Sequence, residues 1–294
     1  MEWQNTPESQ NIEDRRGSGG GGVALGGGGT GGLGIGAIIV LGLIGYFTGI
    51  DPRILIGGAE MVTGAGGGGQ MMGAAQPGQP ADPNDPKLLL MKHVLGETEA
   101  VWAKVLPAQK GVRYTPATLV LFDGATSSGC GTAQAAMGPF YCPDDKKVYL
   151  DMSFFRDMEA HYGGGGDFPD AYVIAHEIGH HVQDLLGILG KADDAKQNMS
   201  KTDANAISVR IELQADCLAG VWAANANTDL KLTPQDIQQA VNTATAIGDD
   251  RLQTAARGYA VPDSFTHGSS AQRVQWLTTG LKSGQIDSCN TFGK

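Results

Sequence analysis

The sequence predicts an α+β protein, in which a mostly helical domain with a small sheet is preceded by one N-terminal transmembrane helix. Three observations lead to this prediction. Apolar residues recur at helical spacing in several segments after residue 86. Two short runs rich in β-branched and aromatic residues, 119–122 and 147–150, are typical of strands. An uncharged apolar run of 18 residues, 33–50, approaches the length of a membrane-spanning helix.

The N-terminal part of the chain differs in composition from the rest. Residues 1–32 are polar and then glycine-rich, which cannot form a packed core, so we expect them to be disordered. Residues 33–56 are the expected transmembrane anchor, and a cleaved signal peptide is the alternative. Residues 57–86 are expected to be a flexible linker, which leaves residues 87–294 as the folded domain.

Charge bears on orientation and on partners. Arg15 and Arg16 precede the apolar run whereas Arg53 follows it, which favours a cytoplasmic N-terminus and an exported domain. The net charge of −10 disfavours nucleic acid as a partner.

The four cysteines, Cys130, Cys142, Cys217 and Cys289, allow three complete pairings and contain no CxxC spacing of the kind found in thiolate zinc sites. In an exported domain two disulfides are expected. We favour Cys130–Cys142, which closes a short loop, with Cys217–Cys289, which ties the C-terminus to a helix. In a cytosolic protein the same residues would be four buried thiols, so the compartment of the domain decides between disulfides and free thiols.

Local patterns define the elements of the domain in order. Apolar residues at helical spacing predict a helix over 87–106, and the two strands follow. Tyr149–Met152 is either a core strand or an edge strand that could pair with an extended peptide. Further helices are predicted over about 168–186, 203–225, 234–255 and 270–281.

The stretch AHEIGHH, residues 175–181, lies within the helix predicted over 168–186. His176 and His180 are four residues apart and share one helix face, where two imidazoles can bind one zinc ion. Glu177 is offset around the helix, so it reaches the water on the metal rather than the metal itself. The motif therefore predicts a catalytic zinc site, with a structural zinc site or ordinary polar helix residues as the alternatives.

A catalytic zinc site needs a third protein ligand. Metzincins carry a histidine at the position of Leu186, so that class is excluded. Glu212 is the one glutamate after the motif, and Asp216 lies one turn later, where it could orient a ligand histidine. Small neighbours would let the two helices approach closely there: Ala215, Ala219 and Gly220.

The pairing of HEIGHH with the later ELQAD, residues 212–216, resembles that of gluzincin metallopeptidases. Essentially the whole chain is similar to the bacterial neutral zinc metallopeptidases of the YpfJ type. The matching segments, besides the glycine-flanked apolar run, are Met1–Trp3, Glu13–Gly17, Gly138–Pro143, His176–Gln183 and His267–Arg273. The resemblance implies a zincin-like, membrane-anchored metallopeptidase with one Zn²⁺ per chain and a peptide or protein substrate.

His267 followed by Arg273 resembles the His-Pro…Arg segment of HtpX-like gluzincins, with Gly268 in place of the proline. By that resemblance His267 would either donate a hydrogen bond to the oxyanion of the tetrahedral intermediate or shape the cleft, and Arg273 would brace an acidic group.

We therefore expect a single-pass zinc endopeptidase of the bacterial cell membrane with an extracytoplasmic catalytic domain. His176, His180 and Glu212 would hold zinc, and Glu177 would be the general base. The alternative is a non-catalytic, zinc-stabilised membrane scaffold or a chaperone-like module that binds peptides. The presence of Glu177 favours the enzyme, because a structural zinc site has no need of a base beside the metal.

Overall fold

The computed structural model describes residues 1–17, 82, 84–162 and 166–293, so the expected anchor, 33–56, and most of the expected linker lie outside these residues. Within the described ranges, no helix is both long and apolar enough to cross a bilayer.

The strands are β1 (Ile12–Asp14), β2 (Thr118–Phe122), β3 (Ala125–Ser128), β4 (Gly131–Gln134), β5 (Phe140–Cys142) and β6 (Lys147–Asp151). The α-helices are α3 (Pro86–Lys110), α4 (Met152–Tyr162), α5 (Asp167–Leu185), α6 (Ile188–Lys196), α7 (Lys201–Leu230), α8 (Pro234–Ala246), α9 (Asp249–Arg257) and α10 (Ser270–Ser283).

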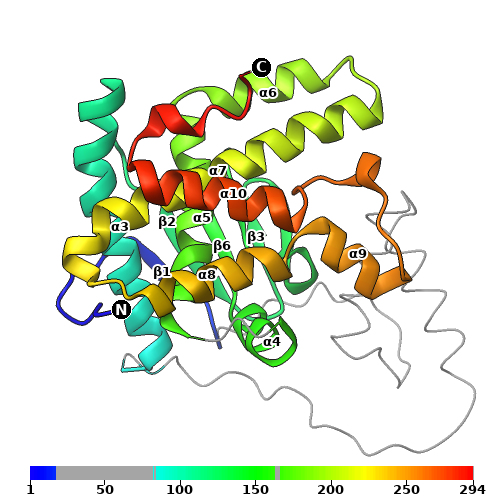
Figure 1. Cartoon of the computed structure of the whole chain (residues 1–294). Helices are drawn as coiled ribbons and strands as arrows, with labels where there is room; N and C mark the ends of the chain where they lie inside the picture. Colours follow the sequence, from blue (N-terminus) through cyan, green and yellow to red (C-terminus); the bar gives the residue numbers. More distant parts are fainter. Residues whose placement is uncertain (18–81, 83, 163–165, 294) are drawn as a thin grey trace, which may run out of the picture.

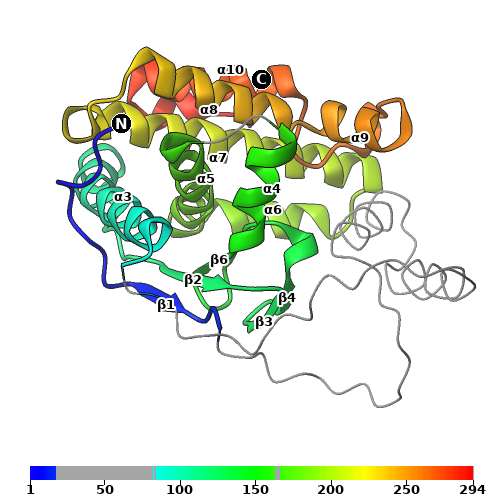
Figure 2. The same ribbon diagram turned by 90° about the horizontal axis from the view of Figure 1, so that it is seen from below.

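The elements form three layers, shown in Figure 2. A four-stranded sheet with the order β1-β2-β6-β5 forms one outer layer. The helices α3, α4 and α5 lie between this sheet and a layer of α7, α8 and α10. Pairing is parallel from β1 to β6 and antiparallel between β6 and β5, and β3 and β4 form a separate hairpin. The predicted class, mostly helical α+β with a small sheet, is confirmed.

The longer helices follow local sequence signals, but one predicted helix is interrupted. Asp85 caps α3 by accepting from the amide of Lys87, and Gly111, with a φ of 66°, ends it. The helix predicted over 234–255 is wrong as a single unit, since it divides into α8 and α9 at Gly248. A Cβ at Gly248 would lie 2.4 Å from the amide nitrogen of Ser270, so the start of α10 occupies the space that a side chain would need.

The strand that contains Tyr149 is internal to the sheet. β6 pairs with β2 on one side, and on the other side Tyr149 pairs with Phe140 of β5. Tyr149 is buried, which favours the core-strand alternative over the edge strand.

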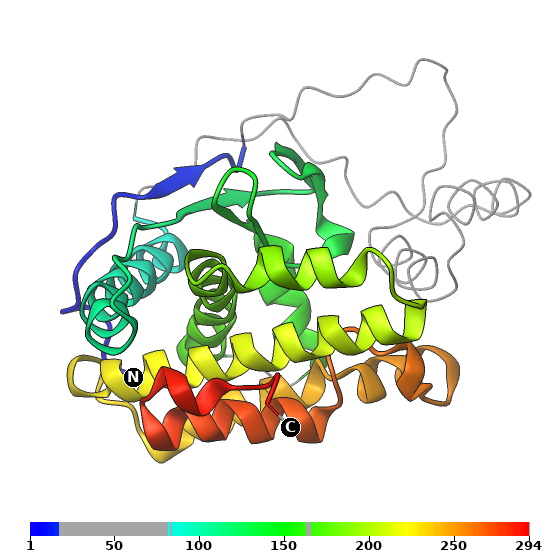
Figure 3. The same ribbon diagram turned by 90° about the horizontal axis from the view of Figure 1, so that it is seen from above.

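Residues 1–17, which we expected to be disordered together with the rest of 1–32, belong to the folded body. We call them the N-terminal arm. The arm runs past α3 to the edge of the sheet, where β1 pairs with β2 (Figure 3). The expectation was wrong for these residues because composition does not show which polar side chains form specific hydrogen bonds. Ser9 and Asn11, for example, both donate to the carboxylate of Glu99.

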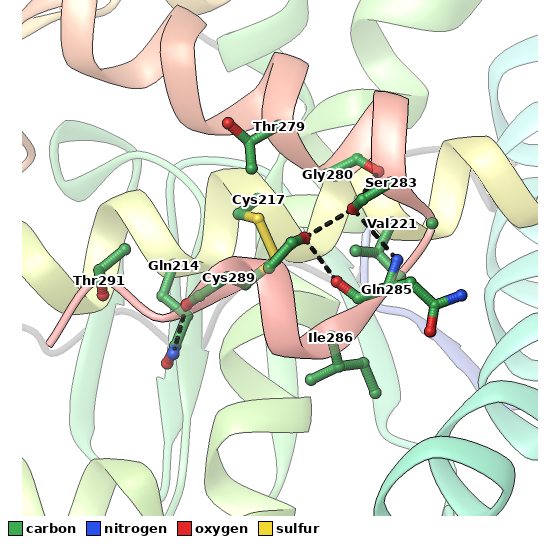
Figure 4. The surroundings of a disulfide bond; sticks show 12 residues. Gln214, Cys217, Val221, Thr279, Gly280, Ser283, Gln285, Ile286, Cys289 and Thr291 are labelled. Carbon is green, nitrogen blue, oxygen red and sulfur yellow. Dashed lines mark hydrogen bonds between the residues drawn. A yellow bond between two sulfur atoms is a disulfide. The ribbon is translucent and has the colours of Figure 1, made fainter. Parts of the chain in front are cut away.

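Both disulfides of the favoured pairing are present. Cys130–Cys142 ties the turn between β3 and β4 to β5, and Cys217–Cys289 ties α7 to a C-terminal 3-10 helix (Figure 4). Near the second bond α7 and α10 approach unusually closely, since a Cβ at Gly280 would lie 1.9 Å from the carbonyl oxygen of Cys217. The second disulfide therefore fastens the C-terminus to the helix that carries Glu212.

Candidate metal centre

The helix α5 carries the AHEIGHH motif through the middle of the domain. On its apolar face Ile174 and Ile178 are fully buried. Gly179, between the two motif histidines, allows α7 to come close: a Cβ there would lie 3.0 Å from the carbonyl oxygen of Ala215. The close approach that we predicted thus involves Ala215, whereas Gly220 faces α10, where a Cβ would lie 2.2 Å from the carbonyl oxygen of Leu277.

Three predicted ligand side chains converge where α5 packs on α7. Nε2 of His176 lies 3.2 Å from Oε2 of Glu212, and Nε2 of His180 lies 3.5 Å from Oε1 of Glu212. The ligand atoms of this group all lie within 4.8 Å of one another. Zinc in a tetrahedral site, with bonds of about 2.0–2.1 Å, separates its ligand atoms by about 3.3–3.4 Å. The separations of 3.2 and 3.5 Å, one to each oxygen of Glu212, are close to this value.

Asp216 fixes the orientation of His176. Its Oδ1 lies 2.9 Å from Nδ1 of His176, so the ring donates from Nδ1 and leaves Nε2 for a metal. The carboxylate is itself held by Nε and Nη2 of Arg273, each at 2.9 Å, and by the hydroxyl of Tyr172 at 2.6 Å. The structure thus brings together Asp216 and Arg273, which were predicted separately, and adds Tyr172, which was not predicted.

Gln183 fixes the orientation of His180 in the same way, although sequence reasoning missed it. Its side-chain nitrogen donates to the carbonyl of Ile211 and to Gln214, so its Oε1 faces Nδ1 of His180 at 2.8 Å. Nε2 of His180 is therefore left for a metal. A signal was available, because Gln183 lies three residues after His180 on the same helix face.

The charges of the site favour a bound cation. Burial acts to lower the pKa of His176, but the charges of Asp216 and Glu212 raise it to about 10. Burial acts to raise the pKa of Glu212, but the charges of His180 and His267 hold it well below its ordinary value. Because a ligand histidine must be neutral, metal binding here would release protons and would be weaker at low pH.

Glu177 lies beside the ligand group and is 6% exposed. Burial raises the pKa of its carboxyl group, and the charges of His176 and His180 oppose that effect. A buried carboxylate with a raised pKa is a better proton acceptor than an exposed one. The neighbouring His181 faces elsewhere, toward Tyr141 and the carbonyl oxygen of Thr115.

His267 lies on the loop before α10, and the buried Asp249 positions that loop. Oδ2 of Asp249 accepts from the backbone amides of Thr266, His267 and Gly268 at 2.7, 2.7 and 3.0 Å. Partial burial acts to lower the pKa of His267, but the charges of Glu212 and Asp249 raise it above its ordinary value. Asp249 and His267 are 18 residues apart in the sequence, which explains why no local pattern identified Asp249.

The two motif histidines and a carboxylate from a second helix form a group that could hold a metal ion, with Glu177 next to it. The chain belongs to the family described as "Putative neutral zinc metallopeptidase", whose model matches residues 1–292. This confirms the resemblance that the sequence motifs indicated.

Relatives span the chain to different extents. The chain is 44% identical to "Uncharacterized protein YpfJ" of Escherichia coli (strain K12) over 298 residues, which cover 100% of this chain and 99% of that protein. It is also 44% identical to "Uncharacterized protein Rv2575" of Mycobacterium tuberculosis over 205 residues, which cover 66% of this chain and 67% of the relative. No solved structure matches the chain.

Proposed function

We propose that this protein is a zinc-dependent endopeptidase in which His176, His180 and Glu212 hold one zinc ion and Glu177 is the general base. The observation that carries the proposal is the arrangement of two imidazoles, each oriented by its own acceptor, around one carboxylate at separations that suit zinc. Membership of a zinc metallopeptidase family supports the same conclusion.

When bound, the ion would supply Lewis-acid activation of water and of the scissile carbonyl. The chain's own residues would perform the proton transfers. Glu177 accepts the proton of the attacking water and returns it to the leaving amine. His267, on the loop held by Asp249, donates a hydrogen bond to the developing oxyanion. The substrate class is peptides or proteins.

The alternative of a zinc-stabilised scaffold or peptide-binding module makes no use of Glu177. A buried carboxylate whose pKa is raised by burial costs stability at neutral pH, since its charged form is poorly solvated. A site that only held the fold together would gain nothing from that cost. This observation favours the enzyme.

Attachment to the membrane and location are part of the same proposal. The apolar segment 33–56, which lies outside the described residues, would attach the protein to the bacterial cell membrane. Two disulfides support an extracytoplasmic catalytic domain, because such bonds persist in oxidising compartments.

The proposal is tested with the full chain, its Glu177→Gln variant and a control variant at the exposed Glu159, Glu159→Gln. Zinc content is measured together with cleavage of a denatured protein and of a quenched-peptide pool. We expect all three to bind one zinc ion and only Glu177→Gln to lose cleavage. Retained cleavage in that variant would refute the mechanism, and zinc binding without cleavage by the unaltered chain would favour the scaffold.

A further inference from the structure

The N-terminal arm precedes the apolar segment in the chain, yet it is docked on the domain that follows that segment. β1 continues the sheet in parallel with β2, with Ile12 opposite Leu119. At the other end of the arm, the indole Nε1 of Trp3 donates to Asp167, in the first turn of α5, at 2.8 Å. Contacts to the sheet and to the helix of the metal-binding motif make the arm part of one folded body with the domain.

The helix α3 is shaped to receive the arm. Gly96 lies in the middle of α3, where glycine disfavours a helix by about 1 kcal/mol relative to alanine. A Cβ at this position would lie 2.2 Å from the carbonyl oxygen of Pro7 and 2.9 Å from the amide nitrogen of Ser9. The backbone of the arm thus occupies the space of the missing side chain, and the amide of Ser9 donates to the carbonyl of Lys92 at 3.0 Å.

The two sides of the intervening segment meet at one point on the surface of the domain. Nη1 of Arg16, near the end of the arm, lies 2.5 Å from Oδ2 of Asp85. Asp85 is the residue that caps α3, where the domain begins. Asp14 holds the same guanidinium at 2.7 Å, so the junction is fixed from both strand and helix. A segment that contains the apolar run therefore starts and finishes at the same ion pair.

We propose that the arm and the domain lie on the same side of the membrane, in place of the single crossing that the sequence led us to expect. One crossing would separate Arg16 from Asp85 by a hydrocarbon layer about 30 Å thick, which their ion pair excludes. The 24 residues from 33 to 56 are too few for two crossing helices of about 20 residues each. The membrane contact is therefore made from the side that carries both the arm and the domain.

This inference rests on the membrane attachment proposed above and not on the zinc chemistry. It is tested by adding one cysteine to the full chain at an exposed position, Asn5→Cys in the arm or Met199→Cys in the domain. Cells are treated with a membrane-impermeant maleimide before and after permeabilisation, and the membrane fraction is analysed. We expect both variants to be labelled alike, either both in intact cells or both only after permeabilisation. Labelling of one in intact cells and of the other only after permeabilisation would overturn the inference.

A second measurement tests the docked arm itself. A protease site inserted between residues 57 and 81 allows the full chain, purified in detergent, to be cut between the arm and the domain. We expect the N-terminal fragment to stay bound to the domain. Gly96→Ala should release it, whereas Gly190→Ala, a helical glycine whose added Cβ would meet nothing within 4 Å, should not. A fragment that separates from the unaltered domain, or that stays bound in Gly96→Ala, would contradict the docking.

Discussion

Replacing Asp216 with asparagine should weaken both the fold and zinc binding. Asp216 is fully buried and accepts hydrogen bonds from His176, Tyr172 and Arg273. Asparagine keeps the size of the side chain but turns one acceptor oxygen into a donor nitrogen. At least one N–H of the bidentate Arg273 would then lose its acceptor, and the guanidinium charge, 3% exposed, would stay buried without a counter-charge.

The two effects have separate magnitudes. Removing one partner of a buried ion pair costs about 3–5 kcal/mol of unfolding free energy. Loss of the acceptor that orients a ligand histidine lowers metal affinity about 10–100-fold, or about 1.4–2.7 kcal/mol. The double variant Asp216→Asn with Arg273→Met removes the unpaired charge as well. It should recover much of the stability but not the zinc affinity, because His176 still lacks its carboxylate.

The assay combines urea unfolding of the metal-free protein with competition for zinc against a chelator. Asp229→Asn serves as the control, because it removes an exposed carboxylate from the same helix, α7. The control should change neither quantity by more than about 0.5 kcal/mol. Unchanged zinc affinity in Asp216→Asn would refute the view that Asp216 orients His176.

Three further predictions follow from the contacts. Gln183→Leu leaves the Nδ1–H of His180 without its acceptor, so zinc affinity measured by chelator competition should fall about tenfold or more. An unchanged affinity would contradict the view that Gln183 orients His180. Replacing Cys217 and Cys289 with serine opens a loop of 72 residues and should lower the unfolding free energy, measured in urea, by about 4 kcal/mol. A loss under about 1 kcal/mol would contradict a stabilising role for this disulfide. Burial raises the pKa of Asp170 from 3.8 to about 6, so the folded state binds this proton more tightly than the unfolded state does. The free energy of unfolding should therefore fall by up to about 3 kcal/mol as pH rises from about 4 to about 6, and Asp170→Asn should remove that dependence. If the unfolding free energy of the variant varied with pH as that of the unaltered chain does, the raised pKa of Asp170 would be refuted.

Helices with strong local signals could be predicted from the sequence. The spacing of His176, Glu177 and His180 identified α5, and Glu212 followed because it is the one glutamate after the motif. Two shorter helices were missed. α4 begins at Met152 directly after β6, with no loop between them, and the nine-residue α6 follows a two-residue break, Leu186 and Gly187. No turn residue separates α4 from the strand before it, and α6 is too short for its periodicity to stand out.

Long-range polar contacts could not be predicted. Asp249 and the loop of His267 are 18 residues apart, and the arm reaches Glu99 through Ser9, 90 residues away in the chain. Such pairs leave no periodic pattern, because each depends on a backbone path set by the rest of the fold. The composition of residues 1–17 indicated disorder for the same reason: it records how polar the arm is but not which partners it meets.

The most direct test of the central claim is X-ray absorption spectroscopy at the zinc edge on the zinc-loaded full chain and on its Glu212→Gln variant. The account predicts two imidazole nitrogens and one carboxylate oxygen at about 2.0–2.2 Å, with one further oxygen from water. The variant should bind zinc more weakly or with a changed oxygen shell. Sulfur ligands, fewer than two imidazoles, or a spectrum and affinity unchanged in Glu212→Gln would contradict the assignment of His176, His180 and Glu212 as the zinc ligands.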